Sequence, residues 1–251
     1  MASVTQRIKQ IKQPKGGYVT PKQFTVIQKS DSLSVDAPEN IHASLIGLAV
    51  DYLTRYMLGA DIMNAFHISI LGARRVNELS LCQDLLNQVD GLSDNSIRAA
   101  CQLAGFDSAF RAGPAYYKPV SGILPDSSTI EHIRIMVNSS LSFWAEYGPV
   151  VKDGFTFEGG YTNFIDSGDG DFLTEDTLWD FKVSVSAPKN TQTLQQLIYY
   201  LMGTHSTCPE FKTIKRLGIF NPRLNNIYLL DISSIPTDVI QEVSSVVIGY
   251  N

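Results

Sequence analysis

The feature that most constrains the fold is a change of hydrophobic pattern at Pro149. Before it, apolar side chains recur with the 3.6-residue period of helices, as in residues 39–59. After it, short apolar runs with strand-like composition are separated by turns, and helical spacing returns at 190–203 and 237–249. The predicted order is a helix, a helical insertion, three strands, a helix, two strands and a closing helix. This order predicts a mixed α/β fold.

The same pattern predicts an arm followed by one domain. Residues 1–38 contain turn signals and one candidate strand, in VTPKQFTVIQ. Residues 39–251 are expected to form a single domain. Within it we expect a helical insertion over about 60–149 and a catalytic core over about 150–232.

Charge is distributed unevenly along the chain. The first 30 residues carry six basic side chains and no acidic one, whereas the other 221 carry 14 basic and 25 acidic ones, a net charge of −11. This acidic balance argues against a protein that coats nucleic acid non-specifically. It is compatible with an enzyme that grips phosphates at one basic edge. The basic arm is that edge, a partner-binding tail or a solvated end.

Composition excludes several classes of protein. Apolar residues make up 44% of the chain and charged residues 18%, so it has enough apolar side chains to build a core and is not disordered as a whole. No apolar run approaches the roughly 18 residues of a membrane-spanning helix, and the first residues lack the apolar stretch of a secretory signal. Three scattered cysteines form neither a disulfide framework nor a metal knuckle. We expect a cytoplasmic protein.

The segment GDGDFLTEDTLWDFKVS carries the clearest chemistry. Side chains alternate along a strand, so Asp180 and Lys182 share one face while Trp179 and Phe181 take the other. A hairpin through the TED turn would bring Asp171, nine residues earlier, close to Asp180. Two carboxylates from adjacent strands make a hard-oxygen site suited to Mg²⁺ or Mn²⁺. A neighbouring lysine can orient a water and stabilise charge on a phosphate, which points to phosphodiester hydrolysis.

The helix expected over NTQTLQQLIYYLMG supports this interpretation. Gln195 and Tyr199 are four residues apart and lie on one helical face. The spacing also allows the pair Gln196–Tyr200. A glutamine presented by this helix could contact the substrate or position the lysine.

Three motifs together resemble the PD-(D/E)XK nuclease superfamily. They are G-x-x-D from Gly168 to Asp171, D-x-K from Asp180 to Lys182, and Q-x-x-x-Y from Gln195 to Tyr199. The RecB-like and CRISPR-associated-exonuclease-like branch is most similar. The helices GLAVDYLTRYMLG and LQQLIYY also resemble uncharacterised bacterial and phage-associated members of it.

The resemblance implies an α-β-β-β-α-β core, the restriction-endonuclease-like fold, in which a mixed sheet is flanked by helices. It implies that Asp171 and Asp180 bind Mg²⁺ or Mn²⁺ with the Phe181 carbonyl, that Lys182 acts on the nucleophilic water, and that Gln195 assists. The proline of the family motif is absent, since residues 169 and 170 are Asp and Gly. The three cysteines are too few for the iron–sulfur cluster of some relatives.

Members of this superfamily often present a further acid or histidine from the first helix. The candidates within residues 39–59 are Glu39, His42 and Asp51. His42 and Asp51 are nine residues apart, about 180° around a helix, so only one can face the metal. Asp51 is preferred, and the alternative is a solvated carboxylate paired with Arg55.

Other polar residues have weaker signals. Asp171 is preferred to Asp169 because it lies nearer the strand centre and fits the motif spacing, and Asp166 is assigned to a loop. Glu158 is a further ligand or, as we favour, a surface charge. The remaining histidines lack metal-ligand spacing, and Ser184 has no evident catalytic partners.

These inferences lead to one main hypothesis and two alternatives. The main one is a magnesium-dependent deoxyribonuclease whose helical region, 60–149, shapes substrate access or recruits a protein partner. The second is a nuclease-fold binding or assembly module in phage or phage-defence biology, with weak or no catalysis. The third is RNA cleavage by the same site. Exonuclease or endonuclease activity, strandedness and oligomeric state stay open.

Overall fold

The computed structural model describes residues 1–29, 35 and 38–250 and divides the chain into two compact units. One unit combines Met1–Ser30 with Trp144–Asn251, and we call it the sheet unit. The other is Asp31–Phe143, and we call it the helical unit. The expected single domain from residue 39 onward is thus two units, and the first 30 residues group with the sheet rather than standing apart.

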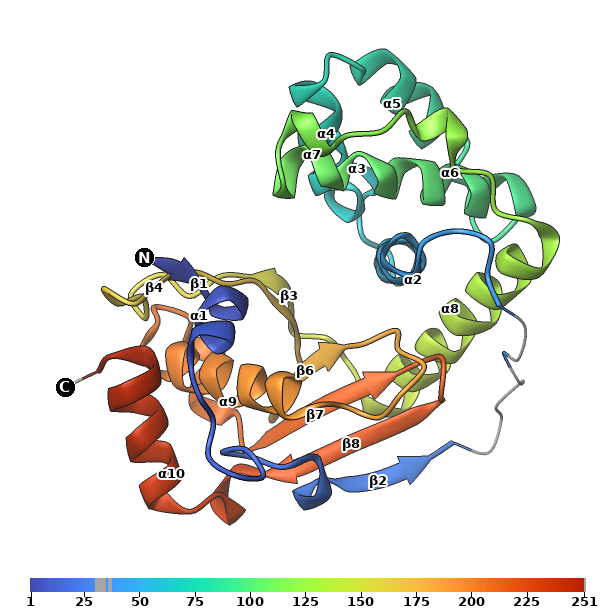
Figure 1. The fold of residues 1–251 in the computed structure, drawn as a ribbon. Helices are drawn as coiled ribbons and strands as arrows, with labels where there is room; N and C mark the ends of the chain where they lie inside the picture. The colour runs from blue at the N-terminus through green and yellow to red at the C-terminus, as the bar shows by residue number, and fades with distance from the viewer. Residues whose placement is uncertain (30–34, 36–37, 251) are drawn as a thin grey trace. The chain divides into compact units, whose positions relative to one another are not determined.

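The sheet unit is built on a mixed six-stranded sheet in the order β2-β8-β7-β6-β5-β3 (Figure 1). Its strands are β2 (Thr25–Gln28), β3 (Lys152–Phe155), β5 (Gly170–Leu173), β6 (Thr177–Phe181), β7 (Arg216–Asn221) and β8 (Asn226–Asp231). Only β6 and β7 pair in parallel, and the other neighbours are antiparallel. Two further short strands, β1 (Ala2–Ser3) and β4 (Ile165–Ser167), pair in parallel beside it. The expected mixed α/β class is confirmed.

The expected hairpin of β5 and β6 is also confirmed. Phe172 pairs with Trp179 and Leu173 with Leu178 in antiparallel register. The turn between the strands is tied by the Trp179 indole, which donates a hydrogen bond to Thr174 Oγ1 at 3.1 Å. The register of this hairpin decides which side chains share a face.

One face of the sheet is covered by α9 (Asn190–His205), the helix that connects the parallel strands β6 and β7 (Figure 1). Its apolar side chains Leu194, Leu197 and Ile198 are fully buried. They belong to the same core as Leu178 and Leu217 of the sheet. The helix forms where predicted because its apolar residues recur at helical spacing.

The opposite face is aromatic. Trp144 and Tyr147, from the end of α8 (Ser127–Tyr147), pack on Phe172 and Trp179 with ring-centroid distances of 4.8 Å and 5.6 Å. Trp144 also stacks on Phe181. Side chains alternate between the two faces along β6. Because Trp179 and Phe181 lie on the aromatic face, Leu178 and Asp180 lie on the face that α9 covers.

The expected N-terminal arm is instead part of the sheet unit. Helix α1 (Val4–Gln10) buries Val4 and Ile8 in the core shared with α9. Arg7 donates hydrogen bonds to the Val246 and Val247 carbonyls at 2.9 Å. The segment then continues through a 3₁₀ turn at Pro21–Gln23 into β2, the strand anticipated in this part of the sequence. Val4 and Ile8 are four residues apart, so they lie on the same face of α1 and are buried together. The helix has only seven residues and lies in a basic segment, so its apolar pattern is weak in the sequence.

The chain closes with α10 (Thr237–Glu242), which continues as a π-helical segment over Val243–Ile248. The segment ends at Gly249, whose φ of 91° lies in the left-handed region that glycine adopts without strain. Val243 and Val247 are buried in the sheet-unit core. The predicted closing helix is thereby confirmed with a different hydrogen-bond pattern in its second half.

The helical unit holds the remaining helices. They are α2 (Ala43–Met57), α3 (Ile62–Ala65), α4 (His67–Arg75), α5 (Leu79–Leu86), α6 (Asp94–Gly105), α7 (Asp107–Arg111) and the part of α8 up to Phe143. A buried Asp107 carboxylate accepts hydrogen bonds from Tyr52 of α2 and Ser69 of α4. No described helix is long and apolar enough to cross a membrane.

The helix expected to begin the core is therefore placed differently. The predicted helix over 39–59 exists as α2, but it belongs to the helical unit. The helix that directly precedes β3 in the chain is α8. Apolar spacing identified residues 39–59 as a helix but could not tell which unit this helix joins, because that choice depends on contacts between distant parts of the chain.

Packing at Gly218 gives a test of the aromatic face. A Cβ at this position of β7 would lie 2.3 Å from Cε3 of Trp179, which is 2% exposed and has little room to move. We expect Gly218→Ala to lower the free energy of unfolding of the sheet unit by about 1–3 kcal/mol. Urea unfolding followed by tryptophan fluorescence measures this, since both tryptophans lie in the sheet unit. Gly122→Ala, where a Cβ meets nothing within 4 Å, should leave the midpoint unchanged.

Candidate functional site

The β5–β6 hairpin brings Asp171 and Asp180 together. The observed register pairs Phe172 with Trp179, and continuing it by one residue sets Asp171 opposite Asp180. Their strand neighbours Leu173 and Leu178 belong to the core under α9, so both carboxylates are on the α9 side of the sheet. The sequence-based prediction that the two carboxylates converge is confirmed.

The Asp171 carboxylate is fixed by the neighbouring strand. Its Oδ2 accepts a hydrogen bond from the backbone N–H of Phe181 at 2.9 Å. Asp171 is half-buried, so part of its side chain is open to solvent. The backbone hydrogen bond fixes the orientation of the Asp171 carboxylate but uses only one of its acceptor positions, so the other lone pairs stay available to a ligand.

Asp180 is more deeply buried and incompletely satisfied. The residue is 2% exposed, and its Oδ1 accepts a hydrogen bond from Lys182 Nζ at 2.8 Å. Its Oδ2 is buried and has no hydrogen-bond partner within the described ranges of the chain. The Lys182 side chain is 27% exposed. The site therefore presents an unpartnered carboxylate oxygen beside a partly exposed lysine side chain.

The charges of the site act on one another. Burial raises the pKa of the Asp180 carboxyl, the Lys182 ammonium lowers it, and the Asp171 carboxylate raises it, with a net rise to about 7. Burial lowers the pKa of Lys182, but the Asp180 and Asp171 carboxylates raise it by more, so the ammonium stays charged at neutral pH. A buried carboxyl with a raised pKa and an unpartnered oxygen is typical of a functional site.

Helix α9 adds two polar groups to the site. Gln195 Nε2 donates a hydrogen bond to the Tyr199 hydroxyl at 2.9 Å. Burial raises the pKa of the Tyr199 phenol, Gln195 lowers it, and the Asp180 and Asp171 carboxylates raise it further, so the hydroxyl stays protonated. The Tyr199 ring packs beside Gly168, three residues before Asp171 in the chain.

The other glutamine of α9 is not paired as the spacing allowed. Gln196 is fully buried, and neither polar atom of its side chain has a hydrogen-bond partner in the part of the chain that the structure describes. The alternative pair Gln196–Tyr200 is therefore not formed. Gln195 is the glutamine on the side of the helix that faces the site.

Asn221 is a residue of this site that sequence reasoning missed. Continuing the β6–β7 register by one residue sets it beside Lys182, whose N–H donates to the Phe220 carbonyl at 2.9 Å. The buried Asn221 amide donates to the Ser184 carbonyl at 2.8 Å and accepts from the Arg223 N–H at 3.1 Å. It thus ties the segment after Lys182 to the β7–β8 turn. The Asn-Pro pair at 221–222 marks a turn in the sequence but does not reveal this contact.

The first-helix candidates all lie in the helical unit. Asp51 accepts a hydrogen bond from Arg55 Nε at 3.0 Å. This is the ion pair that the sequence analysis gave as the alternative to metal binding by Asp51. His42 caps the N-terminus of α2 by accepting from the Ser44 N–H, and Glu39 contacts His132 Nδ1 at 3.1 Å. A metal ligand from this helix stays a prediction.

The remaining carboxylates lie outside the pair. Asp169 and Asp166 are exposed residues ahead of β5 and on β4. Glu158 is exposed and accepts a hydrogen bond from Thr156, as expected of a surface charge. In the described residues no three His, Cys, Asp or Glu side chains gather as a metal cluster. A cation at this site would be held by two carboxylates and backbone oxygen.

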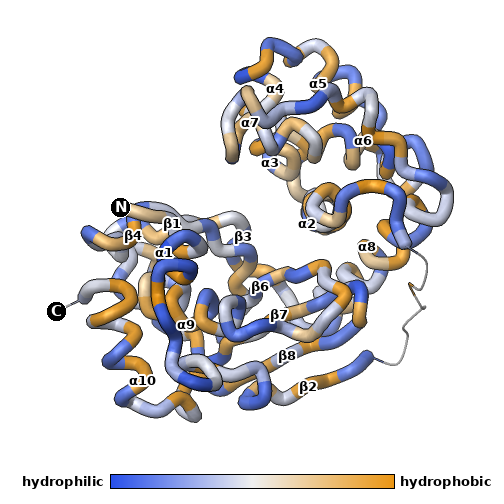
Figure 2. The backbone as a smooth tube through the Cα atoms, viewed as in Figure 1, coloured by the Kyte–Doolittle hydropathy of each residue, from blue (hydrophilic) through white to orange (hydrophobic). Residues whose placement is uncertain are grey.

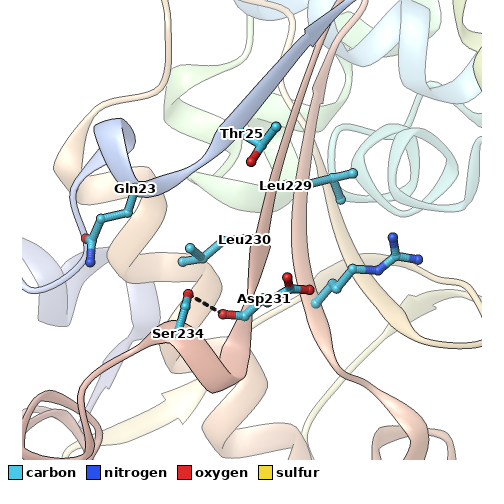
Figure 3. A pocket seen from close by; sticks show the side chains of 7 residues that line it. Gln23, Thr25, Leu229, Leu230, Asp231 and Ser234 are labelled. Carbon is cyan, nitrogen blue, oxygen red and sulfur yellow. Dashed lines mark hydrogen bonds between the residues drawn. The ribbon is translucent and has the colours of Figure 1, made fainter.

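A hollow of about 370 Å³ lies elsewhere in the sheet unit (Figure 3). It is lined by Gln23, Thr25, Arg216, Leu229, Leu230, Asp231 and Ser234. Arg216 begins β7, whereas Lys182 follows the end of the parallel strand β6, so the hollow and the carboxylates are at opposite ends of these strands. Arg216 donates hydrogen bonds to both Asp176 oxygens at 2.8 Å and so ties the start of β7 to the turn between β5 and β6.

Comparison with known proteins adds no assignment. The chain matches no known family, no curated protein and no solved structure. The geometry of the carboxylates and their neighbours is therefore the basis on which a function can be proposed.

The raised pKa of Asp180 predicts how stability depends on pH. An aspartate has a pKa of about 3.9 when unfolded, so the native protein binds more protons than the unfolded chain up to about pH 7. Its contribution to stability is present below pH 4 and is lost as the pH rises through the folded pKa. Without metal, we expect Asp180→Asn to gain stability relative to wild type between pH 4 and pH 8. Urea unfolding in a chelating buffer measures the difference, and a pH-independent difference would contradict the burial argument.

Proposed function

We propose that this protein is a metal-dependent nuclease that hydrolyses phosphodiester bonds of DNA. The observation that carries the proposal is the Asp171–Asp180 pair on adjacent strands, with an unpartnered Asp180 oxygen and Lys182 beside it. Hard oxygen donors next to a charged lysine are the parts that metal-assisted phosphodiester hydrolysis needs.

The topology supports membership of the PD-(D/E)XK superfamily. The elements α8, β3, β5, β6, α9 and β7 follow the α-β-β-β-α-β order of its core, with β4 as a small addition. The pairing supports it too, because three antiparallel neighbours are followed by a strand parallel to the third. In this interpretation α8 takes the place that the sequence analysis gave to residues 39–59.

The donor set fits a divalent cation. The Asp180 Oδ2 atom lacks a hydrogen-bond donor among the described residues, and the Asp171 carboxylate is anchored by a backbone N–H without being enclosed. These two carboxylates would hold Mg²⁺ or Mn²⁺ with the Phe181 carbonyl. Such a cation, when bound, supplies Lewis-acid stabilisation of charge on the phosphate and lowers the pKa of a coordinated water.

The protein's own side chains supply the remaining functions. Lys182, charged and 27% exposed, can orient a water and stabilise negative charge that develops on the phosphate. Asn221 holds the segment that follows this lysine. Gln195 and Tyr199 form a hydrogen-bonded pair near the carboxylates, where they can contact the substrate or limit the motion of Lys182.

Substitution of the site tests the proposal. We expect Asp180→Ala and Lys182→Ala each to lower the DNA cleavage rate by about 10³-fold or more, because each removes an interaction that stabilises the transition state. The rates are measured on linear and circular DNA with Mg²⁺ or Mn²⁺. Cleavage of circular DNA indicates an endonuclease, and cleavage of linear DNA alone indicates an exonuclease.

Asp169→Asn is the matched control, because it removes a nearby carboxylate that lies outside the pair. It should retain wild-type cleavage, and circular dichroism should show that all three variants are folded. Wild-type cleavage by Asp180→Ala or Lys182→Ala would refute the nuclease proposal. Competition between labelled DNA and RNA separates DNA from RNA as the preferred substrate.

A binding or assembly module in phage or phage-defence biology is the second candidate. The observation that favours it is the acidic balance of the chain, a net charge of −5, because an acidic protein repels the phosphates of nucleic acid. A stoichiometric protein complex that survives Asp180→Ala, together with no cleavage by wild type, would favour this function.

A further inference from the structure

We propose that the segment from the last turn of α1 to residue 15 is the surface by which the protein binds the sugar-phosphate backbone of DNA. The surface, which we call the lysine ledge, consists of Lys9, Lys12 and Lys15. This inference rests on the proposed function for its choice of DNA, but it concerns binding rather than cleavage.

The first argument is charge. Apart from the first 30 residues, the sheet unit carries seven basic and thirteen acidic side chains, a net charge of −6. The helical unit carries seven basic and twelve acidic ones, a net charge of −5. A protein that binds a polyanion needs a region of positive potential. Of these three parts of the chain, the first 30 residues, with six basic side chains and no acidic one, are the part with a net positive charge.

The three lysines of the ledge are available to contact phosphates. Two of the six basic residues are occupied, because Arg7 is hydrogen-bonded to the Val246 and Val247 carbonyls and Lys29 pairs with Glu146 at 2.7 Å. The three lysines of the ledge are exposed. None of the three forms an ion pair or a side-chain hydrogen bond with any residue described in the structure. In Figure 2 the tube between α1 and β2 is largely blue or white.

The third argument is position, because the segment is fastened to α9. Ahead of the ledge, at the start of α1, Val4 packs beside Gly168 and Tyr199, as the contacts that a Gly168 Cβ would make show. Just after the ledge, Asn190 Nδ2 donates to the Gly16 carbonyl at 2.8 Å, and Thr193 donates to the Val19 carbonyl. The ledge therefore follows the helix that presents Gln195 and Tyr199 to the carboxylates.

Fastening matters for binding as well as for position. A flexible basic tail would lose conformational entropy when it orders on DNA. A segment already held by a buried Val4 and by two side-chain hydrogen bonds avoids most of that cost. The ledge thus offers fixed positive charges along α9.

Salt-dependent DNA binding tests the ledge. The probe is a fluorescent 30-nucleotide single strand in chelating buffer, measured by anisotropy over a range of KCl concentrations. The slope of log K against log salt is negative, and removal of one lysine–phosphate interaction should reduce its magnitude by about 0.7. We expect Lys12→Gln/Lys15→Gln to reduce the magnitude of the slope by about 1.4 and to weaken binding on the order of tenfold near 0.1 M salt.

Lys212→Gln/Lys215→Gln is the matched control. It removes the same charge from two exposed lysines of the same unit, at the end of β7 remote from Lys182. The control should keep the wild-type slope. Equally weakened binding in the two double variants, or wild-type binding in both, would overturn the ledge.

The result is independent of catalysis. If the ledge variant binds DNA more weakly while wild type cleaves no DNA, the ledge stands and the nuclease proposal falls. If wild type cleaves DNA and the ledge variant binds like wild type, the nuclease proposal stands and the ledge falls.

Discussion

The burial of the Asp180 carboxyl is the constraint on which the candidate site depends. It is taken out of water opposite a second carboxylate, and Lys182 satisfies only one of its oxygens. Burial of a partly satisfied charge is costly, and the raised pKa of Asp180 expresses that cost. A cation between the carboxylates would offset it. This is the reason that we propose the carboxylate pair as a cation site.

The rest of the sheet unit keeps this carboxyl in place. On one face, α9 packs its leucines on the strands and presents Gln195 and Tyr199. On the other face, Trp144 packs on Phe172 of β5 and Phe181 of β6. Because alternate residues of β6 go to opposite faces, the aromatic packing also sets the direction of Asp180 and Lys182.

Local pattern was enough to predict the centre of the site. Two-residue alternation and the TED turn correctly set Asp171, Asp180 and Lys182 on one face, and helical spacing correctly paired Gln195 with Tyr199. These relations span a hairpin or a single helical turn, so periodicity and turn chemistry determine them.

Long-range contacts could not be predicted in the same way. The sequence suggested a basic arm at residues 1–38 and a core helix at 39–59, whereas α1 packs on α9 and α8 precedes the sheet. The Asn221 contact with Ser184 also joins residues 37 positions apart. Each of these depends on which surfaces meet in the folded chain, and amphipathic spacing does not specify the partner.

Metal binding tests the central claim most directly. Calorimetric titration of Mn²⁺ into wild type and Asp180→Ala, with Asp169→Asn as the control, measures whether the carboxylate pair is a cation site. We expect saturable binding to wild type and to Asp169→Asn, and loss of that binding in Asp180→Ala. Absence of binding to wild type, or equal binding to wild type and Asp180→Ala, would contradict the account.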